Sequence, residues 1–376
     1  MRVLYGVVGE GMGHALRSQV VIDHLIARGH RVRIVSSQRA ADYLARRYSG
    51  VHRIHGFFLR SKNNRVQRLR TLGSNLWHGA LALPRQIGAY ADVLEEFEPE
   101  AVISDFDSWT YGYAKAHRLP VFSIDNAQSI HRCAHPSALI AGQESNFRLA
   151  RSLVAAKLPR CDHYFVLSFV PARVTKERTS VHAPVLRPEI LRARPKSGEH
   201  LLVYQTSEGY YQLAAALREI GLECRVYGMR RRLEEEVVDG NLRYRPFDAA
   251  TFAEDLRSAR AVITGGGFTT ISEALHLGKA VLSIPVEKNF EQILNARYLA
   301  HQGFGECAPA ASVEVLHRFL RNVERYSDAV SMYPRQGNNS SLLSQLDSFL
   351  HVDEGSIARR LISGKEWEQA YSGVLQ

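Results

Sequence analysis

The sequence has few cysteines and no long apolar run. Only 4 of its 376 residues are cysteine, and Cys133, Cys161, Cys224 and Cys307 lie far apart without a C-x-x-C pair. This spacing excludes a zinc ribbon and a disulfide framework and is typical of a reducing cytoplasm. No apolar run approaches the roughly 18 to 20 residues that a membrane-spanning helix needs. The first residues enter a strand directly, so neither a signal peptide nor a membrane span is expected.

Acidic residues are missing from one long stretch of the N-terminal half. The formal net charge is +10, and no Asp or Glu lies between Asp42 and Asp92, where many Arg and Lys residues occur. This imbalance indicates an anionic partner or surface. Leucines at helical spacing within 60–90 predict helices that either contact an anionic membrane or pack on their own domain. The interleaved aromatic platform of single-strand binders is lacking, so no nucleic acid partner is expected.

Short β-branched runs alternate with helical patterns, and the alternation restarts near residue 201. This pattern predicts an α/β protein with two doubly wound Rossmann-like domains facing across a cleft. The first domain is expected to span 1–189, followed by a linker over 190–200 and a second domain over 201–345. A helical tail over 346–376 is expected as well, and the sequence does not place it on either domain. The predicted strands are Val3–Val8, Arg31–Val35, Ala101–Ile103, Val121–Ile124, Leu201–Tyr204, Cys224–Tyr227, Leu242–Tyr244, Ala261–Ile263 and Val281–Ile284, and the predicted helices include Ala15–Arg28, Tyr211–Ile220 and Thr270–His276.

The first strand leads into a loop with Gly9, Gly11 and Gly13. Glycines at such a turn let the backbone amides approach a ligand near a helix N-terminus. The spacing G-x-G-x-G differs from the dinucleotide pattern G-x-G-x-x-G, and the loop lacks the lysine of a P-loop. The next strand ends in Ser36 and Ser37 instead of a ribose-binding acid. We therefore expect no nicotinamide or flavin cofactor.

A second glycine loop, TGGGFTTISE at 264–273, follows the strand predicted at Ala261–Ile263. Gly265, Gly266 and Gly267 lead to a helix opening near Thr269 and Thr270, whose amides and dipole can hold a diphosphate. The Glu273 side chain comes one turn later, where a carboxylate can accept hydrogen bonds from the ribose hydroxyls. An ordinary strand-to-helix turn with a favourable N-terminal acid explains the same residues, and the local pattern leaves both interpretations open.

The run TGGGFTTISEAL, followed by GKAVLSIPVEKNFEQILNARYLAHQGFGE, resembles the donor-binding segment of GT-B-fold glycosyltransferases. The similarity is strongest to relatives of the peptidoglycan lipid-linked N-acetylglucosaminyltransferase, in glycosyltransferase families 28 and 1. The segments GEGMGHALRS, SDFDSW and VFSIDNAQ in the first half are similar to the N-terminal domain of that group. The resemblance implies a GT-B fold, with acceptor binding in the first domain and nucleotide-sugar binding in the second.

Carried over by position, the resemblance implies roles for individual residues. Gly266, Gly267 and Thr269 would contact the diphosphate, and Glu273 would contact the ribose. The remaining donor-side residues are Phe247 near the nucleobase and Glu291, Gln292 and Asn295 near the sugar or its phosphate. Val286, Glu287 and Lys288 depart from the glycine or aspartate that relatives often carry there, which leaves the donor sugar open.

An inverting transferase needs a base for the acceptor hydroxyl, and His14 is the predicted base because imidazole titrates near neutral pH. Asp105, after the strand Ala101–Ile103, is the predicted partner that fixes its tautomer. Glu10 and Asp107 are rival bases, and Gly11 and Gly13 complete the acceptor-side loop. Helix capping is the alternative role for Asp105 and Asp107, and a helix-start role is the alternative for His14.

Metal binding is not predicted. Asp105 and Asp107 spell D-x-D, the metal pair of another transferase fold, but they lie in the half opposite the donor loop. His131 and His135 stand at i, i+4 without matching carboxylates and are interpreted as surface histidines.

The predicted function is an inverting glycosyltransferase that moves a hexose-type sugar from a UDP-sugar, or secondarily a dTDP-sugar, to a hydroxyl acceptor. Lipid-linked, polysaccharide and natural-product acceptors remain open. A nucleotide-sugar epimerase of the same fold and a non-catalytic nucleotide-sugar-binding protein are the alternatives. The expected location is the cytoplasm, with peripheral contact to an anionic membrane through 60–90.

Overall fold

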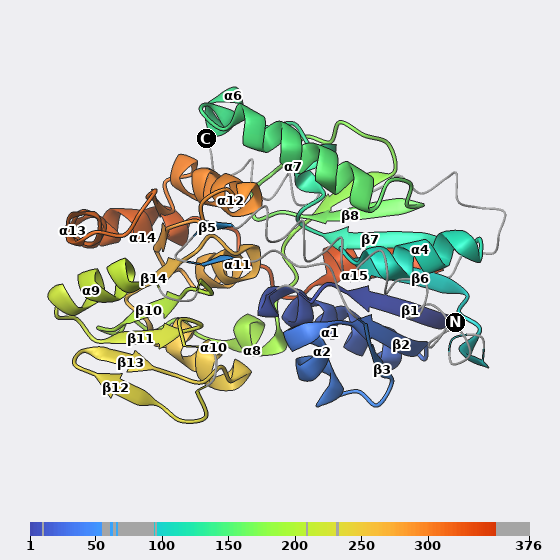
Figure 1. Ribbon diagram of the computed structural model, residues 1–376, viewed down its shortest axis with the longest axis horizontal. Coiled ribbons are helices and arrows are strands. Elements are labelled where there is room, and N and C mark those ends of the chain that lie inside the picture. The colour runs from blue at the N-terminus through green and yellow to red at the C-terminus, as the bar shows by residue number, and fades with distance from the viewer. Residues whose placement is uncertain are drawn as a thin grey trace.

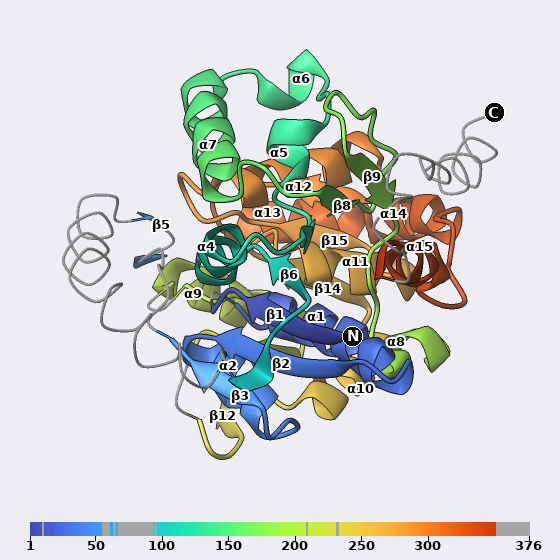
Figure 2. The same ribbon diagram turned by 90° about the vertical axis from the view of Figure 1, so that its right-hand side faces the viewer.

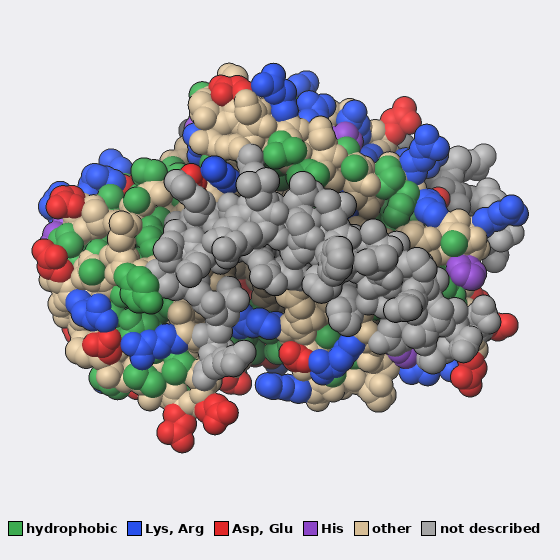
Figure 3. Space-filling view, viewed as in Figure 1, with side chains coloured by type: hydrophobic (Ala, Val, Ile, Leu, Met, Phe, Trp, Pro, Cys, Tyr) green, Lys and Arg blue, Asp and Glu red, His purple; other side chains and the backbone are tan. Residues whose placement is uncertain are grey.

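The computed structural model describes residues 1–9, 11–54, 61–62, 65–66, 94, 96–207, 210–230 and 233–350. They form two lobes, each built around a 7-stranded sheet, with the first lobe on the right and the second on the left of Figure 1. On the face seen in Figure 3, Lys and Arg side chains of the described residues are scattered over both lobes with Asp and Glu between them. The predicted fold class, two doubly wound α/β domains, is confirmed.

All neighbouring strands of the first sheet run parallel, in the order β3-β2-β1-β6-β7-β8-β9. The strands are β1 (Arg2–Val7), β2 (Arg31–Ser36), β3 (Val51–Arg53), β6 (Ala101–Asp105), β7 (Val121–Asp125), β8 (His163–Leu167) and β9 (Thr179–His182). Strand order reverses between β1 and β6, and ligands in such sheets bind at the carboxyl ends of the strands at this point. A separate antiparallel pair joins β4 (Ser61–Lys62) to β5 (Arg65–Val66).

Helices cover both faces of the first sheet. Val3 and Tyr5 of β1 pack in the cluster that contains α1, whereas Leu4 packs on the opposite face with residues of α4. The helices of this lobe are α1 (Met12–Ala27), α2 (Gln38–Ala45), α4 (Ser108–Ala116), α5 (Ser129–Arg132), α6 (Ser137–Ile140) and α7 (Glu144–Lys157). Helix α1 is followed by Gly29 with φ 83°, the left-handed conformation expected of a glycine just after a helix.

The second sheet has the order β12-β13-β11-β10-β14-β15-β16, and only the β12–β13 pair is antiparallel. Its strands are β10 (Leu201–Tyr204), β11 (Cys224–Tyr227), β12 (Val237–Asp239), β13 (Leu242–Tyr244), β14 (Ala261–Thr264), β15 (Val281–Ser283) and β16 (Gly305–Cys307). The order reverses between β10 and β14, so the second glycine loop starts at the equivalent point of the second lobe.

The segment between the sheets follows β9, contains α8 (Pro188–Arg192) and has no regular structure from Ala193 to His200. The remaining helices are α9 (Tyr211–Glu219), α10 (Ala249–Ser258), α11 (Phe268–His276), α12 (Phe290–His301), α13 (Val313–Arg321), α14 (Val323–Ser331) and α15 (Ser340–Leu350). One buried cluster contains residues of both sheets, including Tyr5 and Leu202, so the apolar core continues from lobe to lobe.

Helix α15 returns to the first lobe. Phe349 packs on Phe122 and Phe165 of the first sheet, and Asp347 pairs with His24 of α1. Figure 2 shows α15 and α4 on opposite sides of that sheet. The expected domain limit at residue 345 lies inside this helix, and the rest of the unplaced tail, 351–376, lies outside the described residues.

Candidate active site

The first glycine loop connects β1 to α1. Gly11 is the N-cap of α1 with φ 80°, a conformation that glycine adopts without steric penalty. Gly11 has no side chain that could accept a hydrogen bond from the N–H groups of the first turn of α1. Because α1 begins at Met12, before the predicted start at Ala15, His14 lies in its first turn and not at the end of the loop. Glu10, a predicted acceptor-side residue, lies outside the described residues.

At Gly13 the first glycine loop lies close to the second lobe. A Cβ atom at Gly13 would lie 2.7 Å from Thr269 Oγ1. Thr269 belongs to the first turn of α11, which also starts without a side-chain cap. The N-terminal ends of α1 and α11 therefore meet across the lobes.

His14 and Asp105 form the predicted pair. His14 Nδ1 lies 2.8 Å from Asp105 Oδ1, and the side chains are 17% and 1% exposed. Burial would raise the pKa of Asp105, but the charges of Arg17 and His14 and hydrogen bonds from both hold that pKa well below its ordinary value. The ionised carboxylate accepts the Nδ1–H, which leaves His14 Nε2 as the nitrogen that can take a proton.

Asp107 has a different role from Asp105. Its Oδ2 accepts the backbone N–H of Thr110 at 2.8 Å and the Thr110 hydroxyl at 2.9 Å, so it caps α4. Phe106 lies between the two acids with φ 55°, which turns the backbone at the end of β6. The D-x-D sequence is thus divided between the His14 pair and a helix cap.

A hydrogen-bonded chain that the sequence patterns do not indicate leads from this pair to the second lobe. Arg17 donates through Nε and Nη2 to Asp105 and through Nη1 to Asn126 Oδ1, at 2.8, 2.5 and 2.6 Å. Asn126 Nδ2 donates to Glu291 Oε1 at 2.8 Å. The spacing of Arg17 from His14, three residues on a helix, is the signal that could have suggested it.

The second glycine loop is packed tightly on one side and open on the other. Gly266 has φ 85°, and a Cβ atom there would lie 2.7 Å from the carbonyl oxygen of Gln292. Asn295 Nδ2 donates to the Gly266 carbonyl at 3.1 Å. A Cβ atom at Gly265 would lie 2.8 Å from Gln205 Oε1, the end of a side chain, whereas a Cβ atom at Gly267 would meet nothing within 4 Å. The free side of the loop is therefore at Gly267, where the uncapped helix begins.

Helix α11 starts at Phe268, two residues before its predicted start, so Thr269 and Thr270 lie inside its first turn and are buried. Glu273 is also buried and bonded to Arg187, next to α8. Arg187 Nε and Nη2 lie 2.7 and 2.9 Å from the two Glu273 oxygens. A ribose can reach this carboxylate only if Arg187 shares it or withdraws.

Phe247 belongs to an aromatic cluster at the carboxyl ends of β10 and β11. Its ring centroid lies 6.3 Å from that of Tyr204, 6.4 Å from Tyr227 and 5.6 Å from Phe252. The structure thus places Phe247 on the same edge of the second sheet as the glycine loop.

Three predicted donor-side residues share the N-terminal half of α12 and contact different partners. Glu291 reaches Asn126 of the first lobe, and Asn295 reaches the glycine loop. Gln292 Oε1 accepts the backbone N–H of Val286 at 3.0 Å. Helix α12 therefore joins the glycine loop to the first lobe.

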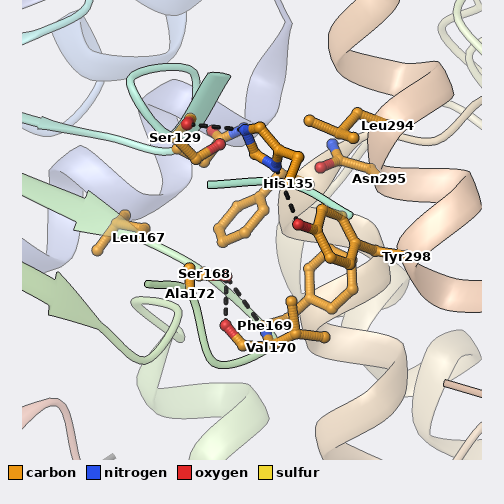
Figure 4. Close-up of a pocket in the computed structure, with 12 residues that line it drawn as sticks. Ser129, His135, Leu167, Ser168, Phe169, Val170, Ala172, Leu294, Asn295 and Tyr298 are labelled. Carbon is orange, nitrogen blue, oxygen red and sulfur yellow. Dashed lines mark hydrogen bonds between the residues drawn. The ribbon is translucent and has the colours of Figure 1, made fainter. Parts of the chain in front are cut away.

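A pocket between the lobes adjoins Asn126 and Asn295 (Figure 4). His135 lines it, with Nδ1 2.9 Å from the Tyr298 hydroxyl and Nε2 3.0 Å from the Ser129 carbonyl. The carbonyl only accepts, so Nε2 carries the proton and Nδ1 accepts from tyrosine. Burial lowers the pKa of His135. Its interpretation as a surface histidine was wrong, because α12 of the other lobe covers it. The apolar lining consists of Leu167, Phe169, Val170, Ala172, Phe268 and Leu294.

The geometry of two facing doubly wound lobes agrees with comparison to known proteins. The model of the family described as glycosyl transferase family 1 matches residues 1–324. The chain belongs to this family. As a glycosyltransferase, it is similar to uncharacterized glycosyltransferases of Methanosarcina mazei, 24% identical over 92% of this chain and 95% of the relative, and of Methanosarcina acetivorans, 23% identical over 89% and 94%.

Solved structures of similar fold are glycosyltransferases as well. The spinosyn rhamnosyltransferase SpnG complexed with spinosyn aglycone has a TM-score of 0.55 and 20% identity, covering 92% of this glycosyltransferase and 100% of that chain. A variant of Os79 from O. sativa in complex with UDP has a TM-score of 0.64 and 15% identity, covering 93% and 99%. The expected GT-B fold is confirmed.

Within the ranges given above, no group of three or more His, Cys, Asp or Glu side chains is arranged to hold a metal ion. Among the same residues, no helix has the length and hydropathy needed to cross a membrane.

Proposed function

We propose that this glycosyltransferase is an inverting enzyme that moves a hexose-type sugar from a UDP-sugar to a hydroxyl acceptor, with a dTDP-sugar as the second candidate donor. The His14–Asp105 pair carries the proposal, because Asp105 holds Nδ1 and leaves Nε2 on a partly exposed ring. A base in this position can remove the acceptor proton while the hydroxyl attacks the sugar from the face opposite the leaving diphosphate.

The donor is proposed to lie on the second lobe. The uncapped start of α11, with Gly265, Gly266, Gly267, Thr269 and Thr270, offers amides and a positive dipole end to the diphosphate. Phe247 lies toward the nucleobase, and Glu291, Gln292 and Asn295 toward the sugar. The proposed contact of Glu273 with the ribose requires that Arg187 share a Glu273 carboxylate oxygen with the ribose or release it.

The proposed reaction does not use a metal ion. Both Asp105 oxygens accept hydrogen bonds from Arg17, and Asp107 is used as the cap of α4. Neither carboxylate is free to form a pair around a cation, and the α11 terminus supplies the positive field that the leaving diphosphate needs.

A panel of UDP- and dTDP-sugars, with release of free nucleotide as the readout, tests the proposal. We expect turnover with at least one UDP-sugar, undiminished in EDTA. His14→Ala should lower turnover roughly 100-fold or more, because a positioned base contributes about that much. His317→Ala is the matched control, since His317 is exposed on α13.

The same assay separates the alternatives. Conversion of the donor to an epimer without nucleotide release would identify an isomerase, and binding without turnover would identify a non-catalytic protein. Full activity of His14→Ala would show that His14 is not the catalytic base. Analysis of the anomeric configuration of the product by NMR tests inversion.

The acceptor classes are those expected from the sequence: lipid-linked, polysaccharide or natural product, used in the cytoplasm. We further propose that the basic segment 60–90 contacts anionic lipid. The charge of this segment supports the proposal, and apart from 61–62 and 65–66 the segment lies outside the described residues. Co-sedimentation should occur with vesicles containing anionic lipid, weaken at high salt, and fall when Arg65, Arg68 and Arg70 are replaced by Gln. Equal sedimentation with neutral vesicles would contradict it.

A further inference from the structure

Arg17 is a buried cation inside the proposed reaction centre. Its side chain is 3% exposed and lies on α1 of the first lobe, one turn after His14. Its guanidinium donates to Asp105 and Asn126. Arg17 Nη2 also lies 2.7 Å from His14 Nδ1, and because Nδ1–H donates to Asp105, this approach is a contact between two donors and not a hydrogen bond. A buried arginine with this set of partners affects several groups at once.

The first effect is on Asp105. The guanidinium contacts both carboxylate oxygens, and Ser18 donates to Oδ2 at 2.9 Å. A bidentate contact of this kind fixes the plane of the carboxylate and keeps the carboxylate ionised. Asp105 therefore holds the His14 ring in one orientation and is not itself available to receive the proton.

The second effect is on Asn126. A guanidinium only donates hydrogen bonds, so the oxygen of the Asn126 amide must face Arg17. The amide nitrogen is thereby directed to Glu291 of the second lobe. Arg17 thus orients one group on the base and another on the proposed donor side.

The third effect is electrostatic. When His14 takes the acceptor proton, its ring becomes a cation beside the guanidinium, which opposes protonation. Among the described residues, the charged groups of this network are Arg17 on α1, Asp105 at the end of β6, Asp125 at the end of β7 and Glu291 on α12. Arg17 offsets the attraction that Asp105 exerts on a protonated ring, so removing Arg17 favours the protonated, inactive base.

We propose that Arg17 is a positioning residue that couples the His14–Asp105 base to the donor-side Glu291 and sets the pH range in which the base is active. This inference rests on the proposed transferase function, since it assigns His14 the role of base. It concerns a residue three positions beyond the base in the sequence.

The test compares pH–rate profiles of donor turnover for the wild type, Arg17→Met and Arg17→Lys. In Arg17→Met, kcat/KM should fall about tenfold or more and its acid limb should move up by about one pH unit, because the opposing charge is lost. In Arg17→Lys, the charge remains and the acid limb should stay at the same pH. The donor KM should rise, because an ammonium lacks the planar fork that contacts both Asp105 oxygens and Asn126 from three separate positions.

Two controls separate this role from a structural one. Arg148→Met, on the exposed side of α7, should leave both parameters unchanged. If Arg17→Met lowers stability and kcat but leaves the pH of the acid limb unchanged, the proposal is overturned. If Arg17→Met does not fold, Arg17→Lys decides, since an unchanged donor KM in that variant would overturn it.

A measurement without turnover keeps the inference distinct from the proposed function. In protein carrying ¹³C-labelled histidine, the His14 ring signal, assigned with His14→Gln, should titrate at higher pH in Arg17→Met by about one unit. If the wild type turns over no nucleotide sugar, the proposed function fails, and this titration still tests Arg17. No movement of the His14 signal would overturn the inference.

Discussion

At the residue scale, two adjacent glycines of the second loop are expected to differ sharply in their tolerance of a side chain. Gly266 has φ 85° and would place a Cβ atom 2.7 Å from a backbone oxygen of α12, whereas Gly267 has φ −65° and open space around it. Gly266→Ala should lower the free energy of unfolding by about 2 kcal/mol or more, because it combines backbone strain with a clash.

Gly267→Ala is the matched control and should change stability by less than about 0.5 kcal/mol. Urea denaturation of the two variants measures the difference. Equal free energies of unfolding for the two variants would contradict the positive φ and the close backbone contact at Gly266. Donor binding should weaken in Gly266→Ala, since displacement of α12 also moves Asn295.

At the element scale, α15 covers two buried histidines of the first sheet. The His182 side chain contacts Ser341 at 3.1 Å, and the His163 ring lies 4.6 Å from that of Phe349. Burial lowers the pKa of His163 to about 3 and that of His182 to about 4. Both rings are therefore neutral in the folded protein near neutral pH.

These shifts predict acid destabilisation. In the unfolded chain each ring takes up a proton as pH falls below its ordinary pKa near 6.5. In the folded protein His182 takes up a proton only near pH 4 and His163 only near pH 3. The free energy of unfolding therefore decreases as pH falls from about 6.5 toward these values. The expected loss is roughly 1 to 2 kcal/mol per ring between pH 7 and pH 5.

Thermal unfolding from pH 7 to pH 5 measures this loss. His182→Asn should flatten the dependence, and His317→Ala, which changes an exposed ring on α13, should not. A wild-type midpoint that does not fall over this range would contradict the assignment of neutral buried rings. Because α15 lies over both rings, its detachment is the expected route of the loss.

At the scale of the whole molecule, the lobes are joined by polar contacts as well as by a continuous core. The buried pair Arg187–Glu273 links the segment before α8 to α11, and Arg297 of α12 donates to the Leu139 carbonyl of the first lobe. Arg187→Met should cost about 3 to 5 kcal/mol, because it leaves a buried carboxylate without its partner.

Replacing both partners should recover most of that loss. The double variant Arg187→Met with Glu273→Leu removes the unpaired charge, whereas Arg218→Met, in the exposed pair with Asp239, should have little effect. Urea denaturation of the set checks this. An Arg187→Met cost no larger than that of Arg218→Met would contradict a tight link between the lobes.

Local pattern was sufficient for the architecture. Strand-sized β-branched runs followed by helical spacing depend on neighbours a few residues away, so β1, β2, β10, β11 and β14 were predictable from the sequence. The same holds for the two glycine loops. The pairing of His14 with Asp105, 91 residues apart, was a hypothesis from two residues that follow strands, and the adjacency of β1 and β6 in the folded sheet brings them together. The family resemblance supplied the rest of the donor-side hypothesis.

Tertiary structure decided which polar groups meet. Arg17 and Asn126 are 109 residues apart, Asn126 and Glu291 are 165 apart, and Arg187 and Glu273 are 86 apart. No local spacing specifies such pairs, because they form only where sheets and lobes pack. The same reason explains why His135 is covered by the other lobe and why α15 returns to the first. The sequence by itself therefore determined the two domains and their glycine loops, and the packing of the lobes decided the partners that surround the base.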